Sequence, residues 1–450
     1  MASRVASLLP LALVGALSGG CSGGPPPVPS GPEGAGPQRI ILISLDTVRA
    51  DHLGVYGYDR PTSPAIDRFA TSAVVFEDAV AQASATLASH ASILTSRIPA
   101  HHGASFSDRH ALGAGVLTLA GLLQEAGYRT IAFTGGGQMD RRFGLDRGFQ
   151  EYQETELNQN FRETAGLGIE WLRANRGERV FLFLHTYEPH HPYVARGLPG
   201  FESDYDGPLP PIISLELLKE INFGSREIDE RDLRHIVNAY DTDLRSTDEG
   251  FRRLHRFLRR QGFLEDALIV LTSDHGEEFG EHGSVGWHGH TLYEEQLRIP
   301  LIVKLPGNAH AGTRVPSSVR SLDIAPTILD LAGVPIPETF QGVSLRSLMS
   351  GSPEAGDLPA LSQLDASPPS VSYRQRPWKL DGTRLFDLGA DPLESRDVAS
   401  AETGRIEELN QAVEEWLGRL PPPSAERVEL EDSTLEQLRA LGYLSREEQH

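Results

Sequence analysis

The residues best suited to chemistry in this 450-residue chain are acids and a histidine that follow two unbroken apolar runs. Asp46 comes directly after Ile40–Leu45, and Asp274 with His275 comes just after Leu268–Thr272. A continuous apolar run of this length is typical of a strand buried on both faces of a parallel sheet. Because open α/β sheets bind ligands at the carboxyl ends of their strands, we expect both runs to deliver their acids to one place.

Two carboxylates and one imidazole form a donor set of hard oxygens with one nitrogen, which suits a divalent cation. We predict one such ion at Asp46, Asp274 and His275, with Ca²⁺ or Mg²⁺ favoured over Mn²⁺ or Zn²⁺. An aspartate after a strand also commonly caps a turn, which would explain each acid separately. The joint placement of both acids favours the metal site.

The run Thr86–Ser96 is predicted to be a helix that begins near Thr86. Thr86 can be interpreted simply as the residue that caps this helix. Its hydroxyl would also lie where the helix dipole favours an anion. His90 is four residues further and therefore on the same face, where it could orient or deprotonate that hydroxyl.

Several segments, in order along the chain, resemble motifs of the sulfatase family within the alkaline phosphatase superfamily. The opening motif is Asp46–His52 with Tyr56–Tyr58, and Thr86–Ser96 resembles the family's signature segment. The later motifs are, in chain order, Gly127–Thr130, Pro189–Tyr193, Ser273–Glu277, Leu292–Glu295, Asp323–Thr327 and Leu385–Pro392. The resemblance extends from Ile40 to Val398 and implies an alkaline-phosphatase-like fold and hydrolysis of an anionic ester.

The resemblance also implies roles for individual residues, beginning with Asp46, Asp274 and His275 as metal ligands. It makes Thr86 the nucleophile, in contact with the metal. His190 is implied to contact the transferred group.

The resemblance makes His288 the residue that assists the leaving oxygen. We interpret His282 and His290, in the same loop-rich region, as structural residues.

The sequence departs from the family pattern at the nucleophile, because Thr86 stands where sulfatases carry the Cys or Ser that becomes formylglycine. Ala88 and His90 replace the Pro and Arg of the signature, and Thr47 replaces a second metal-binding Asp. We therefore expect a plain Thr86 nucleophile and a covalent ester that water hydrolyses. This chemistry favours phosphate esters, whereas the family name implies sulfate esters.

Two other functions remain open at this point. Threonine-bearing relatives in the superfamily include phosphoethanolamine transferases, so one alternative is a phosphoryl transferase. The other is a non-catalytic surface lipoprotein that binds anionic glycans or lipids.

The elements needed to position these residues alternate along the chain, which predicts an α/β fold with a mostly parallel sheet flanked by helices. The predicted strands are Ile40–Leu45, Thr130–Phe133, Val180–Leu184, Leu268–Thr272 and Ile299–Val303. The predicted helices are Leu117–Ala126, Glu163–Asn175, Glu230–Gln261 and Ile324–Leu331.

Composition divides the chain into further parts. We predict an export signal over 1–21, a Gly/Pro-rich tether over 22–38, a catalytic domain over 39–350, a small α+β subdomain over 371–420 and an acidic tail over 421–450. The Pro/Ser/Gly-rich stretch Gly351–Ser370 is predicted to be a linker. The tail is predicted to end in a short helix, Leu435–Leu444.

The net charge of −21 argues against nucleic acid as a partner. An apolar stretch ends in small residues before Cys21, which is the sole cysteine and resembles the lipidation site of a bacterial lipoprotein. We therefore predict an exported protein, periplasmic or at the cell surface, that contacts the membrane only through a lipid anchor at Cys21. The oligomeric state remains open.

Overall fold

The computed structural model describes residues 36–155, 160–194, 201, 205–351, 356–366 and 368–444. Within these residues the central element is an eight-stranded sheet in the order β10-β2-β9-β6-β1-β5-β3-β4. Neighbouring strands are parallel except at β9, which runs antiparallel to both β2 and β6. The strands are β1 (Arg39–Leu45), β2 (Val74–Val80), β3 (Arg129–Thr134), β4 (Glu151–Glu154), β5 (Val180–Thr186), β6 (Ala267–Thr272), β9 (Arg298–Lys304) and β10 (Arg314–Arg320).

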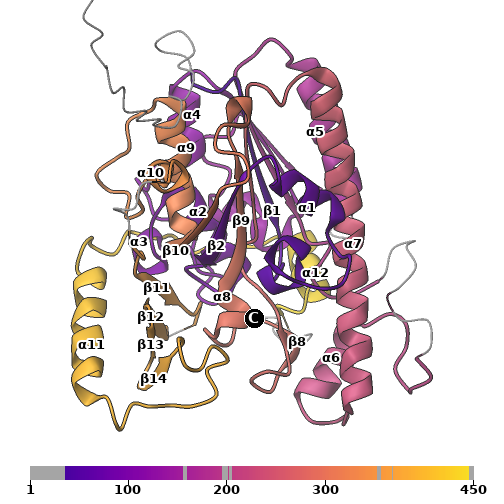
Figure 1. Cartoon of the computed structure of the whole chain (residues 1–450), viewed down its shortest axis with the longest axis vertical. Coiled ribbons are helices and arrows are strands. Elements are labelled where there is room, and N and C mark those ends of the chain that lie inside the picture. Colours follow the sequence, from indigo (N-terminus) through magenta and orange to yellow (C-terminus); the bar gives the residue numbers. More distant parts are fainter. Residues whose placement is uncertain are drawn as a thin grey trace, which may run out of the picture.

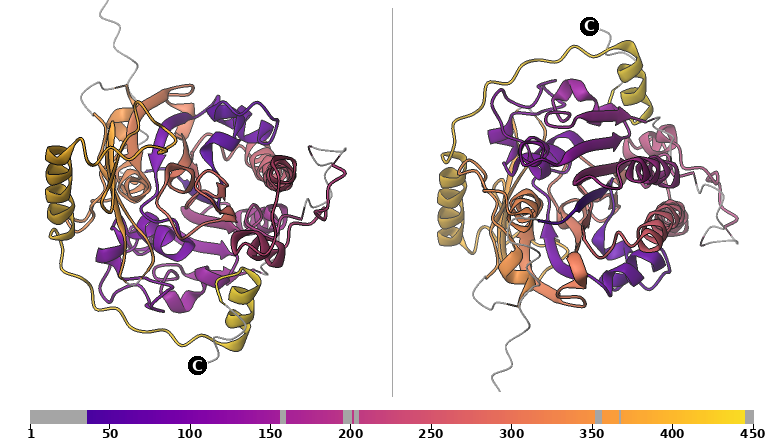
Figure 2. Two further views of the ribbon diagram at one scale, coloured as in Figure 1. Left: turned by 90° about the horizontal axis from the view of Figure 1, so that it is seen from below. Right: turned by 90° about the horizontal axis from the view of Figure 1, so that it is seen from above.

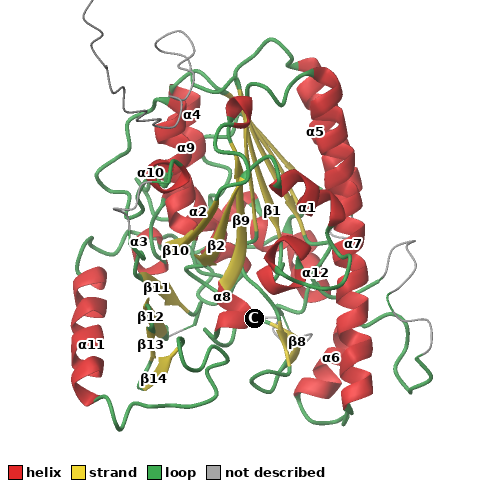
Figure 3. Cartoon of the chain, in the orientation of Figure 1, coloured by secondary structure: helices red, strands yellow, loops and turns green. Residues whose placement is uncertain are grey.

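Helices cover both faces of this sheet (Figures 1 and 3). One layer contains α1 (Pro64–Ala70), α5 (Phe161–Ala174) and α7 (Glu230–Gln261). The other layer contains α2 (Thr86–Thr95), α4 (Leu119–Glu125) and α9 (Ile324–Ala332). The shorter elements are α3 (Pro99–His102), α6 (Leu215–Asn222), α8 (Glu294–Leu297), α10 (Arg346–Met349), η1 (Ala50–His52), η2 (Gly54–Tyr56), η3 (Gly137–Met139), η4 (Arg141–Phe143), η5 (Pro306–Asn308), η6 (Ser321–Asp323) and the ribbon of β7 (Glu278–Phe279) and β8 (Val285–Trp287).

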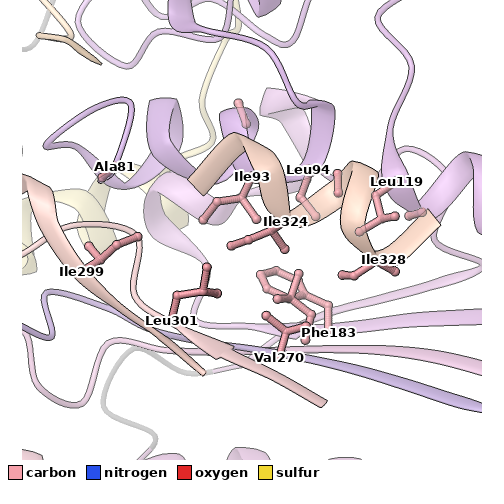
Figure 4. Close-up of a cluster of buried hydrophobic side chains, with 14 of the residues drawn as sticks. Ala81, Ile93, Leu94, Leu119, Phe183, Val270, Ile299, Leu301, Ile324 and Ile328 are labelled. Carbon is pink, nitrogen blue, oxygen red and sulfur yellow. The ribbon is translucent and has the colours of Figure 1, made fainter. Parts of the chain in front are cut away.

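Strand β1 shows why the apolar runs are continuous. Ile40 and Leu42 point into the core beneath α2, α4 and α9, part of which is drawn in Figure 4. Ile41 and Ile43 point into the opposite core, beneath α1, α5 and α7. Every residue of β1 is buried, as a strand in the middle of a covered sheet requires.

A second, antiparallel sheet follows the catalytic domain in the order β11-β12-β13-β14. Its core contains Leu409 and Trp416 from the long helix that covers it. Ile98, before α3, and Leu322, in η6, belong to the same core, so the small sheet packs against the catalytic domain. The elements are β11 (Ala360–Gln363), β12 (Val371–Gln375), β13 (Trp378–Asp381), β14 (Arg384–Asp387) and α11 (Thr403–Leu417).

The structure confirms the predicted fold class and all of the predicted strands and helices of the catalytic domain, but it adds elements that the sequence analysis does not contain. Strands β2, β4 and β10 are not among the predicted strands. Of these, β4 and β10 are the two edge strands of the sheet, and both mix polar with apolar residues. Strand β11 lies inside the stretch predicted to be a linker, where Ser362 Oγ donates to the carbonyl of Ala81 at 2.6 Å.

The C-terminal part of the chain crosses the outside of the molecule from α11 to α12 (Asp432–Ala440), which lies on the opposite side (Figure 2). Backbone hydrogen bonds at 2.9 Å from Ala111 to Glu426 and at 2.7 Å from Val428 to Arg109 hold it to the catalytic domain. The helix predicted to reach Leu444 ends earlier, because the chain turns at Gly442.

The export signal and Cys21 lie outside the described residues. Among the helices that the structure describes, none combines the length and the apolar character that a membrane crossing requires.

Candidate active site

Three adjacent strands deliver the candidate residues to one edge of the sheet. Strand β1 pairs with β5 on one side and with β6 on the other, all parallel. Asp46 follows β1, His185 lies at the end of β5, and Asp274 with His275 follows β6. All four side chains are fully buried. The prediction that the two apolar runs bring their acids together is confirmed.

Thr86 is the first residue of α2 rather than its cap. Ala85 holds the capping position, where its side chain makes no capping hydrogen bond. Its Oγ1 lies 3.3 Å from Asp46 Oδ2 and 3.4 Å from His275 Nε2. The hydroxyl therefore faces the two acids and the histidine, and the interpretation of Thr86 as only a cap is wrong.

Asp46, Asp274 and His275 offer ligand atoms that lie within 4.8 Å of one another. Asp46 Oδ1 and Asp274 Oδ2 are buried oxygens without a hydrogen-bond partner in the described structure. Burial raises the pKa of Asp46 to about 7, and burial together with Asp46 raises the pKa of Asp274. Because unpaired buried carboxylates are costly, these two oxygens fit a site for a divalent cation.

The ring of His275 has a defined orientation. Its Nδ1 donates to the carbonyl of Gly276 at 2.9 Å, which leaves Nε2 facing Thr86 and Asp274. Burial alone would lower the pKa of His275, but the carboxylates of Asp274 and Asp46 outweigh it and raise the pKa. An imidazole whose Nδ1 is held by a carbonyl while its Nε2 faces carboxylates has the arrangement of a metal-ligating histidine.

The His90 side chain bonds to other groups than the Thr86 hydroxyl, contrary to the prediction. Its Nδ1 donates to the backbone carbonyl of Thr86 at 2.8 Å, and its Nε2 accepts from Ser44 Oγ at 2.9 Å. Burial lowers the pKa of His90 to about 4, so the ring is neutral. Both nitrogens are engaged, because a helical side chain points back along its own helix toward the preceding turn. His90 positions the start of α2 and does not deprotonate Thr86.

His185 belongs to the site, although the sequence analysis did not select it. Its Nε2 donates to Asp46 Oδ2 at 3.2 Å, and its Nδ1 accepts from the backbone of Gly135 at 3.3 Å. The only signal in the sequence is a histidine at the end of an apolar run, which the parallel pairing of β1 and β5 turns into a contact.

His190 and His288 converge on the same place from two loops. His190 Nδ1 donates to the carbonyl of His191 at 2.6 Å, and His288 Nδ1 lies 2.9 Å from Glu277 Oε1. Their Nε2 atoms lie 3.0 and 3.2 Å from the hydroxyl of Tyr443. Burial lowers the pKa of both imidazoles well below its usual range, so both are neutral. His288 is thus uncharged in this state.

Tyr443 is the second site residue that the sequence analysis missed. Its hydroxyl also lies 3.2 Å from Thr86 Oγ1, so it touches the candidate nucleophile as well as both histidines. Burial raises the pKa of this phenol well above its usual value, which keeps it protonated. No local pattern marks it, because it comes from the far end of the chain.

The remaining two histidines of this region make contacts away from Thr86. His282 stacks on Tyr293 with ring centroids 3.4 Å apart and pairs with Glu295 at 2.7 Å. His290 Nε2 lies 3.3 Å from Glu278 Oε2.

Comparison with known proteins identifies relatives of this chain. The model of the family described as Sulfatase matches residues 38–334. The choline-sulfatase of Rhizobium meliloti is 31% identical over 240 residues, which cover 49% of this chain and 46% of that protein. The ulvan-active sulfatase of Formosa agariphila is 23% identical over 406 residues, covering 80% and 76%. The aligned part of the chain thus spans about half of the first relative and three quarters of the second.

Solved structures share the whole architecture. The phosphonate monoester hydrolase of Agrobacterium radiobacter superposes with a TM-score of 0.69 at 19% identity, covering 88% of this chain and 98% of that chain. A 2-O GAG sulfatase superposes with a TM-score of 0.70 at 20% identity, covering 85% and 92%. These superpositions show an alkaline-phosphatase-like fold. Because the family model matches well over half of the chain, including strands β1 and β6, the chain is a member of the sulfatase family.

Proposed function

We propose that this protein is a metal-dependent hydrolase that cleaves an anionic ester through a covalent intermediate on Thr86. The observation that carries the proposal is the Thr86 hydroxyl, which is buried at the start of α2 and faces Asp46 and His275. A threonine that only stabilised the helix would bond to its backbone instead.

In the proposed reaction, Thr86 Oγ1 forms a bond to the phosphorus or sulfur of the ester as the bond to the leaving oxygen breaks. The Thr86 proton passes to Asp46 Oδ2, the oxygen that accepts it in the hydrogen bond at 3.3 Å. In the second step a water oxygen bonds to the phosphorus or sulfur as the bond to Thr86 Oγ1 breaks. Asp46 Oδ2 returns its proton to Oγ1, and the proton that the water loses passes to His288 Nε2.

The ligand set for the metal is Asp46, Asp274 and His275, with Thr86 beside it. When bound there, a divalent cation supplies positive charge that lowers the pKa of the Thr86 hydroxyl and balances the charge of the ester. The oxygen-rich donor set favours Ca²⁺ or Mg²⁺, with Mn²⁺ and Zn²⁺ as alternatives.

His190 and His288 are proposed to bind the transferred group and the leaving oxygen through their Nε2 atoms. Burial raises the pKa of Glu277 to about 7, and its Oε1 is 2.9 Å from His288 Nδ1. The Glu277–His288 pair can therefore hold a proton near neutral pH, which His288 Nε2 delivers to the leaving oxygen.

We propose phosphate or phosphonate esters as the substrates in preference to sulfate esters. The supporting observation is Thr86 itself, because an alkoxide nucleophile releases its product only by a second substitution at phosphorus or sulfur. Substitution of this kind is the established course of phosphoryl transfer. The phosphonate monoester hydrolase fold neighbour is consistent with this preference.

The test is turnover of aryl phosphate, phosphodiester, phosphonate monoester and aryl sulfate by the metal-loaded protein. Thr86→Ala should lower kcat/KM at least about a thousandfold, whereas Thr86→Ser keeps the hydroxyl and a good part of the activity. Thr95→Ala, at the other end of α2, is the matched control, because the Thr95 hydroxyl bonds only to the carbonyl of Ala91.

Rapid quenching followed by peptide mass spectrometry should trap a Thr86 adduct. An active Thr86→Ala protein would shift the attack to water. Absence of both turnover and bound metal in the purified protein would favour the alternative of a non-catalytic binding protein.

A further inference from the structure

The C-terminal segment Asp432–Leu444 places one oxygen atom at the centre of the proposed reaction. The Tyr443 hydroxyl is 3.2 Å from Thr86 Oγ1, 3.0 Å from His190 Nε2 and 3.2 Å from His288 Nε2. These are the atoms that the proposed function assigns to the nucleophile, the transferred group and the leaving oxygen. An ester bound for reaction and the Tyr443 hydroxyl would need the same place.

The C-terminal segment is attached to the catalytic domain by specific contacts along its length. Leu438 is fully buried. Thr434 Oγ1 donates to Asp140 at 2.6 Å, and the backbone of Gly137 donates to Gln437 Oε1 at 3.0 Å. The phenol therefore enters the site as part of a docked element.

The turn that delivers Tyr443 requires glycine at position 442. Gly442 has a φ of +86°, and a Cβ there would lie 2.6 Å from Leu215 Cδ1 and 3.3 Å from His191 Nε2. His191 Nε2 also donates to the carbonyl of Leu441 at 3.1 Å. The Tyr443 ring then rests at 5.6 Å from the ring of Phe106. Leu215, His191 and Phe106 thus contact the C-terminal segment where it turns into the site.

We propose that Tyr443 is a specificity-determining residue, an internal ligand of the reaction centre that a substrate must displace. The inference rests on the proposed function, since it uses the roles of Thr86, His190 and His288. A phenol has one proton and one oxygen to offer to these three partners. A phosphoryl or sulfuryl group offers several anionic oxygens, so it can replace the phenol where a neutral ligand cannot.

This arrangement selects ligands by charge and by hydrogen-bonding capacity. Displacement needs to involve only the end of the segment around Gly442 and Tyr443, because the contacts of Thr434 and Gln437 lie further back in α12. An anionic ester would thus displace the Tyr443 hydroxyl and bind in its position. A neutral compound would not displace it and would be excluded from the site.

The test uses the metal-loaded full chain and orthovanadate, an anion with the tetrahedral shape of the transferred group. Calorimetry should give about tenfold tighter vanadate binding for Tyr443→Ala and about threefold tighter binding for Tyr443→Phe, from the loss of one or two hydrogen bonds that compete with the anion. KM for the ester should fall by similar factors. Glu436→Ala, on the exposed side of α12, is the control and should change neither value.

Hydrogen exchange supplies a second readout that does not depend on turnover. Vanadate should increase the exchange of the backbone amides of Leu441–Leu444 in the wild type. Increased protection there, or unchanged vanadate affinity in Tyr443→Ala, would overturn the proposal while leaving the proposed function intact. A large loss of kcat in Tyr443→Phe would also overturn it, because Tyr443 would then act in the chemistry. If neither wild type nor variants bind vanadate, the proposed function itself fails.

Discussion

Two clusters of buried charge in this protein differ in how their acids are paired. The first is the candidate active site, with Asp46, Asp274 and His275. The second, which we call the junction cluster, joins the catalytic domain to the small C-terminal sheet. It consists of Glu294 on α8, Arg374 on β12, Lys379 on β13 and Glu394.

In the junction cluster every acid has a cation beside it. Lys379 Nζ lies 3.1 Å from Glu294 Oε1 and 2.8 Å from Glu394 Oε1, and Arg374 lies 3.4 Å from Glu294 Oε2. Burial alone would raise the pKa of Glu294, but Arg374 and Lys379 outweigh it and lower the pKa to about 2. Each of the two acids thus has the Lys379 ammonium within 3.1 Å.

In the candidate active site the acids have no Lys or Arg among their contacts in the described structure. Burial raises the pKa of Asp46 to about 7, and Asp46 and Asp274 each keep one oxygen without a hydrogen bond. The difference teaches that a buried acid paired within the chain leaves an uncompensated charge when its cation is removed. Buried acids left without a cation indicate a ligand from outside.

The largest expected effect comes from changing an acid of the active site. Asp274→Asn keeps the shape of the side chain and the acceptor for the Thr47 backbone. We expect kcat/KM to fall by about a thousandfold and affinity for the divalent cation to fall as well. The free energy of unfolding of the metal-free protein should not fall, because an uncompensated charge is removed. Turnover, metal titration and urea denaturation measure the three quantities, and a stability loss without an activity loss would make Asp274 a structural residue.

The opposite pattern is expected in the junction cluster. Lys379→Met leaves Glu394 and part of Glu294 without their cation, and it should reduce the free energy of unfolding by about 3 kcal/mol. The kcat should remain unchanged, because Lys379 lies in the small sheet. Lys219→Met, at a half-buried position on α6, serves as the control. Equal stability losses in both variants would contradict the special role of the junction cluster.

The smallest effect is the pH dependence, and its sign differs between Asp46 and Glu294. The pKa of Asp46 is raised from 3.8 to about 7, so its contribution to the stability of the metal-free protein is present below pH 3.8 and is lost as the pH rises through 7. The pKa of Glu294 is lowered from 4.5 to about 2, so its contribution is present above pH 4.5 and is lost as the pH falls toward 2.

Metal binding should consequently release more protons per cation at pH 6 than at pH 9, because Asp46 and His275, whose pKa values are both raised, must be deprotonated to bind the ion. Calorimetry in buffers with different ionisation enthalpies measures this number. The same proton release at both pH values would show that Asp46 does not titrate with the metal.

Much of the fold and part of the candidate site can be predicted from short stretches of sequence. The apolar runs before Asp46 and Asp274 are buried strands, and parallel pairing brings their ends together by a general rule of α/β sheets. The helix that contains Thr86 and His90 can also be predicted from neighbouring residues, but the orientation of the His90 ring cannot. That ring bonds to the Thr86 carbonyl and to Ser44, which only the packed structure shows.

By itself, the sequence determined the alternation of strands and helices, the family motifs and the acids that could hold a metal. These features depend on periodicity and on neighbours in the chain. Tertiary structure decided which acids pair with a Lys or Arg of the chain. It also placed His185 against Asp46 and Tyr443 against Thr86. Tyr443 and Thr86 are 357 positions apart. A contact between residues so distant depends on the packing of the whole chain, and no local pattern encodes it.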